Sequence, residues 1–461
     1  MKKLELITCR KVYSVVILGL LLLAYCFACY HTGLIDTRLV IPQPLARRKN
    51  STDGPPVEDA IRTHVFQIGD TARSLYSDTL GKLPTNPQYH RRWDVNCSAI
   101  FAGSERVITS VSKQLLQEQQ EQSLMPSDSK VVTWTNDCTL YKKQRGYPTT
   151  PNSDEEAGFP LAYILVVHTG AAQVERLLRA IYQPQNVYCL HPDSKSPREF
   201  HQAIAGLANC FDNVFIASKL EDVVYAGVTL LLTNINCMKD LTGRSASGHP
   251  WRYVMNLCGQ DFPLRTNLEI VGQLKAHNGQ NEIQSSVPDK RKSRRTEFKF
   301  ILRNKSIVRT KSRNGPAPHQ LKLYSGSAYY AVTRDFVRYI LSDPVAIDFL
   351  DWTRNTHMPE ETYWATLQRA PGVPGGNYRA DPQIRPFSVR YVLWYTRASP
   401  HKCRGKYIRR VCVFTIGDIH YVQQQPHLFA NKFYYDYDPV SLQCLEEALE
   451  FRVRHSEESD K

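Results

Sequence analysis

Two adjacent carboxylates, Glu360 and Glu361, could supply a general base in the segment HMPEETYWATL, residues 357–367. A carboxylate held beside a hydroxyl group can take its proton as the oxygen attacks an electrophilic carbon. A plainer interpretation is that the two acids begin a helix, because Pro359 suits the first helical position and acids complement the positive end of the helix dipole. Taken alone, the segment favours the helix start.

Polar residues also follow three apolar segments that have the composition of buried strands. His168 follows ILVV, Asp193 follows YCLHP and Asp261 follows NLCGQ. Ligands of open α/β sheets bind outside the carboxyl ends of the strands, so three polar strand ends together favour a nucleotide-type site. The chain contains neither the glycine-rich fingerprint of dinucleotide-binding folds nor the P-loop motif. A nucleotide-sugar is the remaining common ligand of such a site.

The elements that must position these residues alternate between strand and helix from residue 159 onwards. FPLAYILVV (159–167) has the length of a buried strand, and in AAQVERLLRAIY (171–182) the apolar residues recur at helical spacing. Alternating strands and amphipathic helices predict an α/β fold with a mostly parallel sheet and helices on both faces. The further predicted strands are 186–193, 213–218 and 251–261, and the further predicted helices are 196–210 and 228–241.

The N-terminal segment 12–30 contains 19 uncharged, mostly apolar residues, close to the roughly 20 needed to span a bilayer as a helix. Four basic residues precede it and none follows before Arg38, so the N-terminus is predicted to be cytosolic and the rest luminal. A cleaved signal peptide is the alternative, although its apolar core would be only about 7–15 residues long. We expect a cytoplasmic tail at 1–11, a signal-anchor at 12–30, a stem at 31–90 and a luminal globular domain at 91–461.

Nine of the twelve cysteines lie beyond the predicted anchor. In an oxidising compartment an odd number suggests four disulfides and one free thiol, with pairings that the sequence alone leaves open. No zinc-binding spacing is present. The sequons at Asn50, Asn96 and Asn304 fit a secretory lumen.

The net charge of +14 and the segment DKRKSRR (289–295) could indicate nucleic acid as a partner. The predicted anchor argues against that partner. Phosphates of a nucleotide-sugar, or acidic glycans, are the more plausible partners of a basic luminal protein. The alternative is that the segment is a solvated basic loop.

The sequence resembles the core 2 and I-branching β-1,6-N-acetylglucosaminyltransferase family from about Cys97 to Cys444. The resemblance implies a Golgi type II membrane enzyme whose luminal catalytic domain has a GT-A-like fold. Such enzymes invert the anomeric centre as they pass N-acetylglucosamine from UDP-N-acetylglucosamine to the 6-hydroxyl of a sugar. The matching landmarks are FPLAYILVVH, LLRAIYQPQNVYCLHPD, CFDNVFIASKLEDVVYAG, NLCGQDFPLRTN, YSGSAYYAVTRDFV, PEETYWATLQR, VCVFTIGD and HLFANKF.

The resemblance also implies roles for individual residues. Glu361 matches the family's base, which leaves Glu360 as a helix-start residue. The family uses no metal, and an arginine and a lysine instead meet the leaving diphosphate, since fixed cations can stabilise developing charge. These correspond to Arg409, with Arg410 as an adjacent candidate, and to Lys432. The implied uridine-binding residues are Val166, His168, Asp193 and Tyr225.

A DxD sequence does occur at Asp436 and Asp438, but it follows FANKF rather than a core strand. We expect a solvated acidic turn there instead of a metal site. Family positions further imply that Cys258 is a free thiol and that Asn96 is glycosylated. The implied disulfides are Cys97 with Cys444, Cys138 with Cys210, Cys189 with Cys237 and Cys403 with Cys412.

The acceptor positions depart from the family pattern. Gln284 stands where core 2 members have a glutamate, which removes charge-assisted hydrogen bonds to sugar hydroxyls. Lys292, Arg295 and Trp394 match the acceptor residues, but Thr396 replaces an expected tyrosine. The donor is therefore better defined than the acceptor.

The leading acceptor is the GalNAc of core 1 O-glycans, Galβ1-3GalNAc, followed by I-branching of poly-N-acetyllactosamine. Rival functions are a catalytically silent Golgi protein that binds UDP or glycans, a peptide O-xylosyltransferase and a sulfotransferase. A homodimer linked through Cys26 or Cys29 is a further open alternative.

Overall fold

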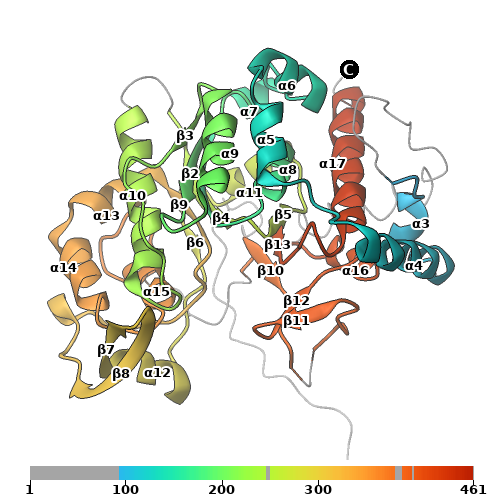
Figure 1. Ribbon diagram of the computed structural model, residues 1–461. Helices are drawn as coiled ribbons and strands as arrows, with labels where there is room; N and C mark the ends of the chain where they lie inside the picture. Colours follow the sequence, from blue (N-terminus) through green and yellow to red (C-terminus); the bar gives the residue numbers. More distant parts are fainter. Residues whose placement is uncertain (1–92, 246–249, 379–386, 397–398, 460–461) are drawn as a thin grey trace, which may run out of the picture. The chain divides into compact units, whose positions relative to one another are not determined.

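A six-stranded sheet forms the centre of the fold in the computed structural model, which describes residues 93–245, 250–378, 387–396 and 399–459 (Figure 1). The strand order is β3-β2-β1-β4-β9-β6. The first four strands are parallel, whereas β9 runs antiparallel to both β4 and β6. The predicted parallel-rich α/β sheet is therefore confirmed. Its strands are β1 (Leu161–Val167), β2 (Val187–Pro192), β3 (Val214–Ile216), β4 (Tyr253–Cys258), β9 (Tyr330–Thr333) and β6 (Glu282–Ile283).

Helices cover both faces of this sheet, because successive residues of each strand point to opposite sides. Tyr163 and Leu165 of β1 pack with α8 (Ala171–Ile181) and α9 (Arg198–Asn209). Ala162 and Ile164 of the same strand pack with α10 (Val228–Ser245) and α13 (Arg334–Ser342) on the other face. Nearly every residue of β1, β2 and β4 is buried, which explains why these strands are continuous hydrophobic runs in the sequence.

A second, three-stranded sheet has the order β10-β13-β5 and carries the C-terminal part of the chain. It packs with N-terminal and C-terminal helices in a third apolar cluster. The elements of this region are β5 (Asp261–Pro263), β10 (Arg390–Val392), β13 (Phe429–Asn431), the hairpin β11 (Lys406–Ile408) and β12 (Val411–Val413), and the helices α3 (Cys97–Phe101), α4 (Glu105–Glu121), α16 (Ile419–Val422) and α17 (Pro439–Ser459).

A separate hairpin of β7 (Phe298–Arg303) and β8 (Ser306–Arg313) follows the basic helix α12 (Lys290–Glu297). Figure 1 shows these three elements beside α14 and α15, outside the central sheet. The remaining elements are α5 (Asp128–Trp134), α6 (Cys138–Arg145), α7 (Asp154–Ala157), α11 (Asn267–Ala276), the 3-10 turn η1 (Pro318–Gln320), α14 (Pro344–Thr353) and α15 (Glu360–Leu367).

Four disulfides are present, three between distant segments and one across nine residues, and they are the four pairs that the resemblance implies. Cys258 is the free cysteine of the described residues. Removing a native disulfide from a secreted domain typically costs about 2–5 kcal/mol of stability. The pairs are Cys97–Cys444, Cys138–Cys210, Cys189–Cys237 and Cys403–Cys412.

In the described part of the chain, no helix combines the length and the apolar character that crossing a bilayer requires. The expected tail, signal-anchor and stem, residues 1–90, lie outside the described residues, as do Asn50, Cys26 and Cys29. The other two sequons are exposed. Asn96 caps α3 by accepting a hydrogen bond from Ala99 N at 3.0 Å, and Asn304 occupies the turn between β7 and β8.

Candidate active site

The carboxyl ends of β1 and β2 bring three of the predicted donor-site residues together. Val166 pairs with His191 across these strands, and His168 follows directly after β1. The backbone N–H of Asp193 donates to the Val167 carbonyl oxygen over 2.8 Å, which places Asp193 beside the end of β1. The sequence prediction that polar strand ends converge at this edge is confirmed for His168 and Asp193.

Asp193 is only 6% exposed and fixes the loop that carries Tyr225. Its carboxylate accepts hydrogen bonds from Val223 N at 3.2 Å and from Lys195 Nζ at 2.7 Å. Lys195 also pairs with Asp222 of the same loop at 2.8 Å. Because these bonds hold both the carboxylate and the loop, the edge of the sheet presents a preformed surface for a polar ligand.

Arg409 reaches this surface from the turn of the β11–β12 hairpin. Its guanidinium group lies 4.4 Å from the centre of the exposed Tyr225 ring, a favourable cation–π geometry. Arg409 and Arg410 both have positive φ, 51° and 67°, which is uncommon for residues other than glycine. Arg410 donates from Nη2 to the Tyr395 carbonyl oxygen at 3.2 Å, so the two arginines have different environments and Arg409 is the one against Tyr225.

Lys432 adds a second cation near Arg409, directly after β13. Burial is the main reason that the pKa of Lys432 lies below its ordinary value, and the neighbouring Arg409 lowers it further. Burial likewise lowers the pKa of His168, where Asp193 opposes the shift. Lys195 and Arg409 add to the lowering at His168. Two cations that interact electrostatically favour a ligand that carries more than one negative charge, such as a diphosphate.

Glu361 lies in the first turn of α15, and the start of that helix is tied to the donor side. Met358, with φ of 52°, donates its N–H to the Ala226 carbonyl oxygen at 2.9 Å, next to Tyr225. The Glu361 carboxylate forms an ion pair with Arg295 of α12 and keeps about a quarter of its side chain exposed. This accessible carboxylate, aimed by an arginine and a helix start, can take a proton from a bound hydroxyl group.

Glu360 is the first residue of α15, as expected for a helix start, but its side chain is buried rather than solvated. It is 6% exposed, and its Oε2 has no hydrogen-bond partner among the described residues. Burial raises the pKa of Glu360 to about 8, and the charge of Glu361 adds to that rise. The two adjacent glutamates therefore have opposite environments, and Glu361 is the one open to solvent.

The predicted acceptor residues fall into two groups. Lys292 and Arg295 belong to α12, and Gln284 is exposed just after β6. The backbone of Gln284 approaches Gly326 so closely that a Cβ atom added to this glycine would lie 1.7 Å from the Gln284 carbonyl oxygen. The N–H of Gly326 in turn donates to the Glu361 carbonyl oxygen at 2.8 Å. Gln284 is therefore a backbone neighbour of Glu361.

Trp394 lies on the other side, beside the hairpin that carries Arg409. It is 55% exposed and pairs with Val411 of β12. Within the described ranges, no hydrogen bond or ion pair joins Trp394 to Glu361 or Arg295. Thr396 is exposed as well.

Asp261, although it follows a strand as predicted, is a buried structural residue. Its carboxylate forms an ion pair with Arg390 at 3.2 Å, with both side chains fully buried, and accepts from Asn431 Nδ2 at 2.8 Å. It has little capacity left for a ligand, so its expected place at the nucleotide edge is wrong. Arg390 comes from β10, 129 residues later in the chain, and no local pattern predicts this pairing. The nearby Cys258 is partly buried, and desolvation of its thiol raises its pKa to about 12, to which the charge of Asp261 contributes.

The expectation of a solvated acidic turn at the DxD sequence is wrong for Asp438. Asp438 is buried and accepts from Ile416 N at 2.7 Å and Ser441 N at 2.8 Å, so it caps the start of α17. Burial raises the pKa of Asp438 to about 6. Asp436, by contrast, is exposed. The two carboxylates differ in role, since only the exposed one is available to solvent.

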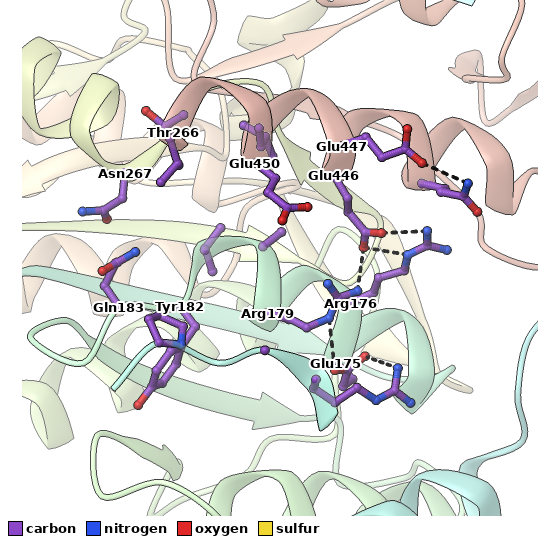
Figure 2. Close-up of a pocket in the computed structure, with 18 of the residues that line it drawn as sticks. Glu175, Arg176, Arg179, Tyr182, Gln183, Thr266, Asn267, Glu446, Glu447 and Glu450 are labelled. Atoms are coloured by element: carbon purple, nitrogen blue, oxygen red, sulfur yellow. Dashed lines mark hydrogen bonds and ion pairs between the residues drawn. The ribbon is translucent and has the colours of Figure 1, made fainter. Parts of the chain in front are cut away.

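A cavity of about 310 Å³ lies between α8 and α17, and no predicted site residue lines it. Figure 2 shows some of the residues that line it. Its charged side chains neutralise one another. Arg176 pairs with Glu446 at 2.7 Å, and Arg179 pairs with the same carboxylate at 2.9 Å and with Glu175 at 3.4 Å. These groups join the two helices and are already partnered, so the cavity is not the candidate active site.

The geometry therefore describes a site with donor-side cations at the carboxyl edge of a parallel-rich sheet and a carboxylate across from them. The model of the family described as Core-2/I-Branching enzyme matches residues 161–423, which include nearly all of these residues. The chain belongs to this family. Lys432 alone of the proposed donor-side residues lies beyond the matched range.

Three relatives have similar lengths of matching sequence. The chain is 41% identical to beta-1,3-galactosyl-O-glycosyl-glycoprotein beta-1,6-N-acetylglucosaminyltransferase 4 of Danio rerio, over 77% of this chain and 84% of the relative. It is 39% identical to beta-1,3-galactosyl-O-glycosyl-glycoprotein beta-1,6-N-acetylglucosaminyltransferase 3 of Mus musculus, over 84% of this chain and 88% of the relative. It is 38% identical to the unnumbered enzyme of Homo sapiens, over 78% and 86%.

Proposed function

We propose that this chain is an inverting β-1,6-N-acetylglucosaminyltransferase that uses UDP-N-acetylglucosamine. The observation that carries the proposal is the position of Glu361, an accessible carboxylate whose helix start is bonded to the loop of Tyr225. The parallel-rich sheet with helices on both faces is consistent with a GT-A-like fold. The three relatives are named for β-1,6-N-acetylglucosaminyl transfer to β-1,3-galactosyl-O-glycosyl-glycoproteins.

In this proposal the donor binds at the carboxyl edge of β1 and β2. The preformed loop around Asp193 offers carboxylate oxygens to donors on the base or ribose, and the Tyr225 ring offers an exposed aromatic face. The diphosphate lies against Arg409 and Lys432, the two neighbouring cations of this edge. The residues proposed to bind uridine are Val166, His168, Asp193 and Tyr225.

Glu361 then takes the proton of the acceptor 6-hydroxyl while that oxygen forms a bond to the anomeric carbon. The bond between this carbon and the β-phosphate oxygen breaks on the opposite face, which inverts the configuration. UDP leaves with the bonding electrons, and Arg409 and Lys432 stabilise its added negative charge. Fixed cations can supply this stabilisation with little reorganisation, so we propose a metal-independent reaction.

The proposed acceptor is the GalNAc of a core 1 O-glycan, consistent with the relatives' names. Arg295 pairs with the Glu361 carboxylate, and the backbone of Gln284 lies against Gly326, whose N–H donates to the Glu361 carbonyl oxygen. The proposed acceptor-binding residues are Gln284, Lys292, Arg295 and Trp394. Branching of poly-N-acetyllactosamine is the second candidate, since the matching family description includes I-branching.

We also propose that residues 12–30 anchor the chain in the Golgi membrane with residues 91–461 as the luminal catalytic domain. The four disulfides and the exposed Asn96 and Asn304 support an oxidising, glycosylating lumen. Sensitivity of the mature chain to removal of N-glycans, and protection of its C-terminus from protease in intact vesicles, would test this orientation.

The decisive experiment is transfer by the detergent-solubilised full chain from UDP-N-acetylglucosamine to core 1, core 3 and I-type acceptors, with and without a chelator. The expected result is a chelator-resistant β-1,6-linked product on core 1. Product on the I-type acceptor alone would shift the proposal to the second acceptor. UDP binding without transfer to any of the three acceptors would contradict the proposed activity.

A further inference from the structure

The segment from Lys290 to Arg313, which comprises α12 and the β7–β8 hairpin, carries most of the chain's excess positive charge. It contains eleven lysines and arginines and one acid, Glu297, whereas the whole chain has a net charge of +14. We refer to this segment as the basic arm. Such a high density of positive charge within 24 residues favours binding of a negatively charged partner.

Most cations of the basic arm form no salt bridge within the described part of the chain, although the charge of Asp289 acts on Arg291 and Lys292 and that of Asp222 acts on Lys305. Arg295 pairs with Glu361, and Arg313 pairs with Glu297 at 3.1 Å. Arg309 stacks over the Phe298 ring at 4.4 Å, which holds the side chain but does not neutralise it. The remaining cations repel one another, and an anionic partner would relieve that repulsion.

The arm is fixed beside both halves of the candidate active site. The Ile307 side chain packs against Gly227, two residues after Tyr225, since an added Cβ there would lie 3.0 Å from it. On the other side, Phe300 N donates to the Asn355 carbonyl oxygen at 2.8 Å, and His357 N donates to the Arg295 carbonyl oxygen at 2.9 Å. The arm therefore flanks the approach to Glu361.

The β7–β8 register mixes cationic and apolar side chains on one face. Ile301 pairs with Val308, and these residues are 48% and 42% exposed. Arg303 lies two residues after Ile301 and is also exposed, so the alternation of the strand places it on the same face as Ile301 and Val308. Lys299 is exposed as well, at the irregularity in the register between Phe298 and Phe300. An extended polypeptide with acidic side chains fits such a surface, because its backbone and methylenes can cover the apolar residues.

We infer that the basic arm binds anionic groups that flank the accepting O-glycan in a glycoprotein, and so selects acidic acceptors. This inference rests on the proposed function, because the accepting sugar must lie at Glu361. The anionic groups are the carboxylates of residues that neighbour the glycosylated residue, because the mixed cationic and apolar face of the hairpin fits an extended acidic polypeptide. Attraction of this kind acts at a distance and lowers KM without changing the chemistry at Glu361.

The test uses the full chain and core 1 glycopeptides of equal length with acidic, neutral or basic residues around the glycan. A fourth glycopeptide is neutral but carries a neighbouring sialylated glycan. We expect the KM for the acidic peptide to be about tenfold or more below that of the neutral peptide at low ionic strength. The difference should shrink in salt, since the Debye length falls from about 30 Å at 0.01 M to about 8 Å at 0.15 M.

The arm variant is Lys299→Glu, Arg303→Glu and Lys311→Glu, three exposed positions away from the proposed catalytic groups. The matched control makes the same charge change on α4, α5 and α6, at exposed lysines far along the chain from the arm. We expect the arm variant to lose the preference for acidic peptides through KM, with kcat on the neutral peptide retained. The control substitutions are Lys113→Glu, Lys130→Glu and Lys143→Glu.

Direct binding of the same fluorescent glycopeptides, measured without a donor, separates this inference from the proposed function. Tighter binding of acidic peptides by the wild type and the control, lost in the arm variant, would support the arm even if no sugar were transferred. Equal peptide preference in the wild type and the arm variant would overturn it. A gain only for the sialylated peptide would overturn the assignment to peptide carboxylates.

Discussion

The donor side and the acceptor side of the candidate active site are built in different ways. Asp193 is 6% exposed and held by hydrogen bonds to the loop around Val223, at the end of a buried strand. On the acceptor side Gln284 is exposed, and Trp394 is 55% exposed beside a hairpin. Tyr225 is an exposed member of the donor side, yet the stacked Arg409 holds its ring.

This difference separates what folding requires from what substrate choice requires. Val166, His168 and Asp193 lie at the ends of strands β1 and β2, whose other side chains belong to the two main core clusters, so a change in strand position would disturb the core. Acceptor residues occupy surface segments, where substitutions cost little stability. The departures from the family pattern, Gln284 and Thr396, both lie on exposed positions of this second kind.

The largest expected effect on activity is at Glu361, the proposed base that acts on the acceptor as it attacks the donor. Glu361→Gln keeps the size of the side chain but cannot accept the proton, so we expect kcat to fall by about 10²–10⁴-fold. Affinity for UDP should stay close to that of the wild type, because the donor residues are unchanged. Initial rates and calorimetric titration with UDP measure the two quantities.

The matched control for this variant is Glu199→Gln, at an exposed acid of α9, which should leave the rate unchanged. Transfer by Glu361→Gln at a tenth of the wild-type rate or more would contradict its role as the base. Loss of UDP binding in the same variant would instead indicate a structural defect.

The next largest effect belongs to the donor side alone. Replacing Lys432 or Arg409 by Met removes one cation from the leaving group, and we expect kcat to fall by about 10²–10³-fold. Affinity for UDP should fall in these variants, unlike in Glu361→Gln. Arg410→Met should have the smaller effect, because Arg410 donates to the Tyr395 carbonyl oxygen.

Initial rates with and without a chelator complete this test. An equal loss in the Arg409 and Arg410 variants would contradict the assignment of roles within the hairpin turn. A strong loss on adding chelator to the wild type would contradict the metal-independent mechanism.

The sequence predicted the alternating strands and helices well, because their apolar residues are local and periodic. It could not predict which polar strand ends face a ligand. Asp261 and Asp193 both follow an apolar segment in the sequence, but the Asp261 carboxylate forms an ion pair with Arg390 of a distant strand. This ion pair depends on the second sheet, which joins segments far apart in the sequence and which no local sequence pattern predicts.

The backbone conformation of individual turns could not be predicted from the sequence either. Arg409 and Arg410 are neighbours with the same chemistry, and only their turn conformation separates their side chains. The role of Asp438 in the DxD sequence could not be predicted either, since this residue caps the start of α17. The family resemblance supplied residue roles, whereas the structure supplied the contacts that make those roles testable.

A smaller effect is expected on the acceptor side. Gln284→Glu restores a carboxylate beside Glu361 and should strengthen hydrogen bonds to acceptor hydroxyls by about 0.5–1.5 kcal/mol. We expect the KM for core 1 to fall about two- to tenfold, while the KM for the donor stays the same. Kinetics with each substrate varied in turn separate the two values.

Gln280→Glu, a nearby exposed glutamine, is the control for added charge. A higher KM for core 1 in Gln284→Glu than in this control would mean that the amide suits the acceptor better. That result would favour an acceptor other than core 1.

The smallest effect concerns stability rather than activity and lies between the two sides, at Glu360. Its folded-state pKa of about 8 lies above the ordinary value of 4.5 because of burial. The folded protein therefore binds an extra proton between these pH values, and its stability falls as pH rises through this window. Glu360→Gln mimics the protonated acid, so we expect a gain of about 1–3 kcal/mol at pH 8 and little change at pH 5. Thermal unfolding of both proteins at pH 5, 6.5 and 8 measures this, and an equal shift in Tm at all three values would mean that Glu360 does not titrate in this range.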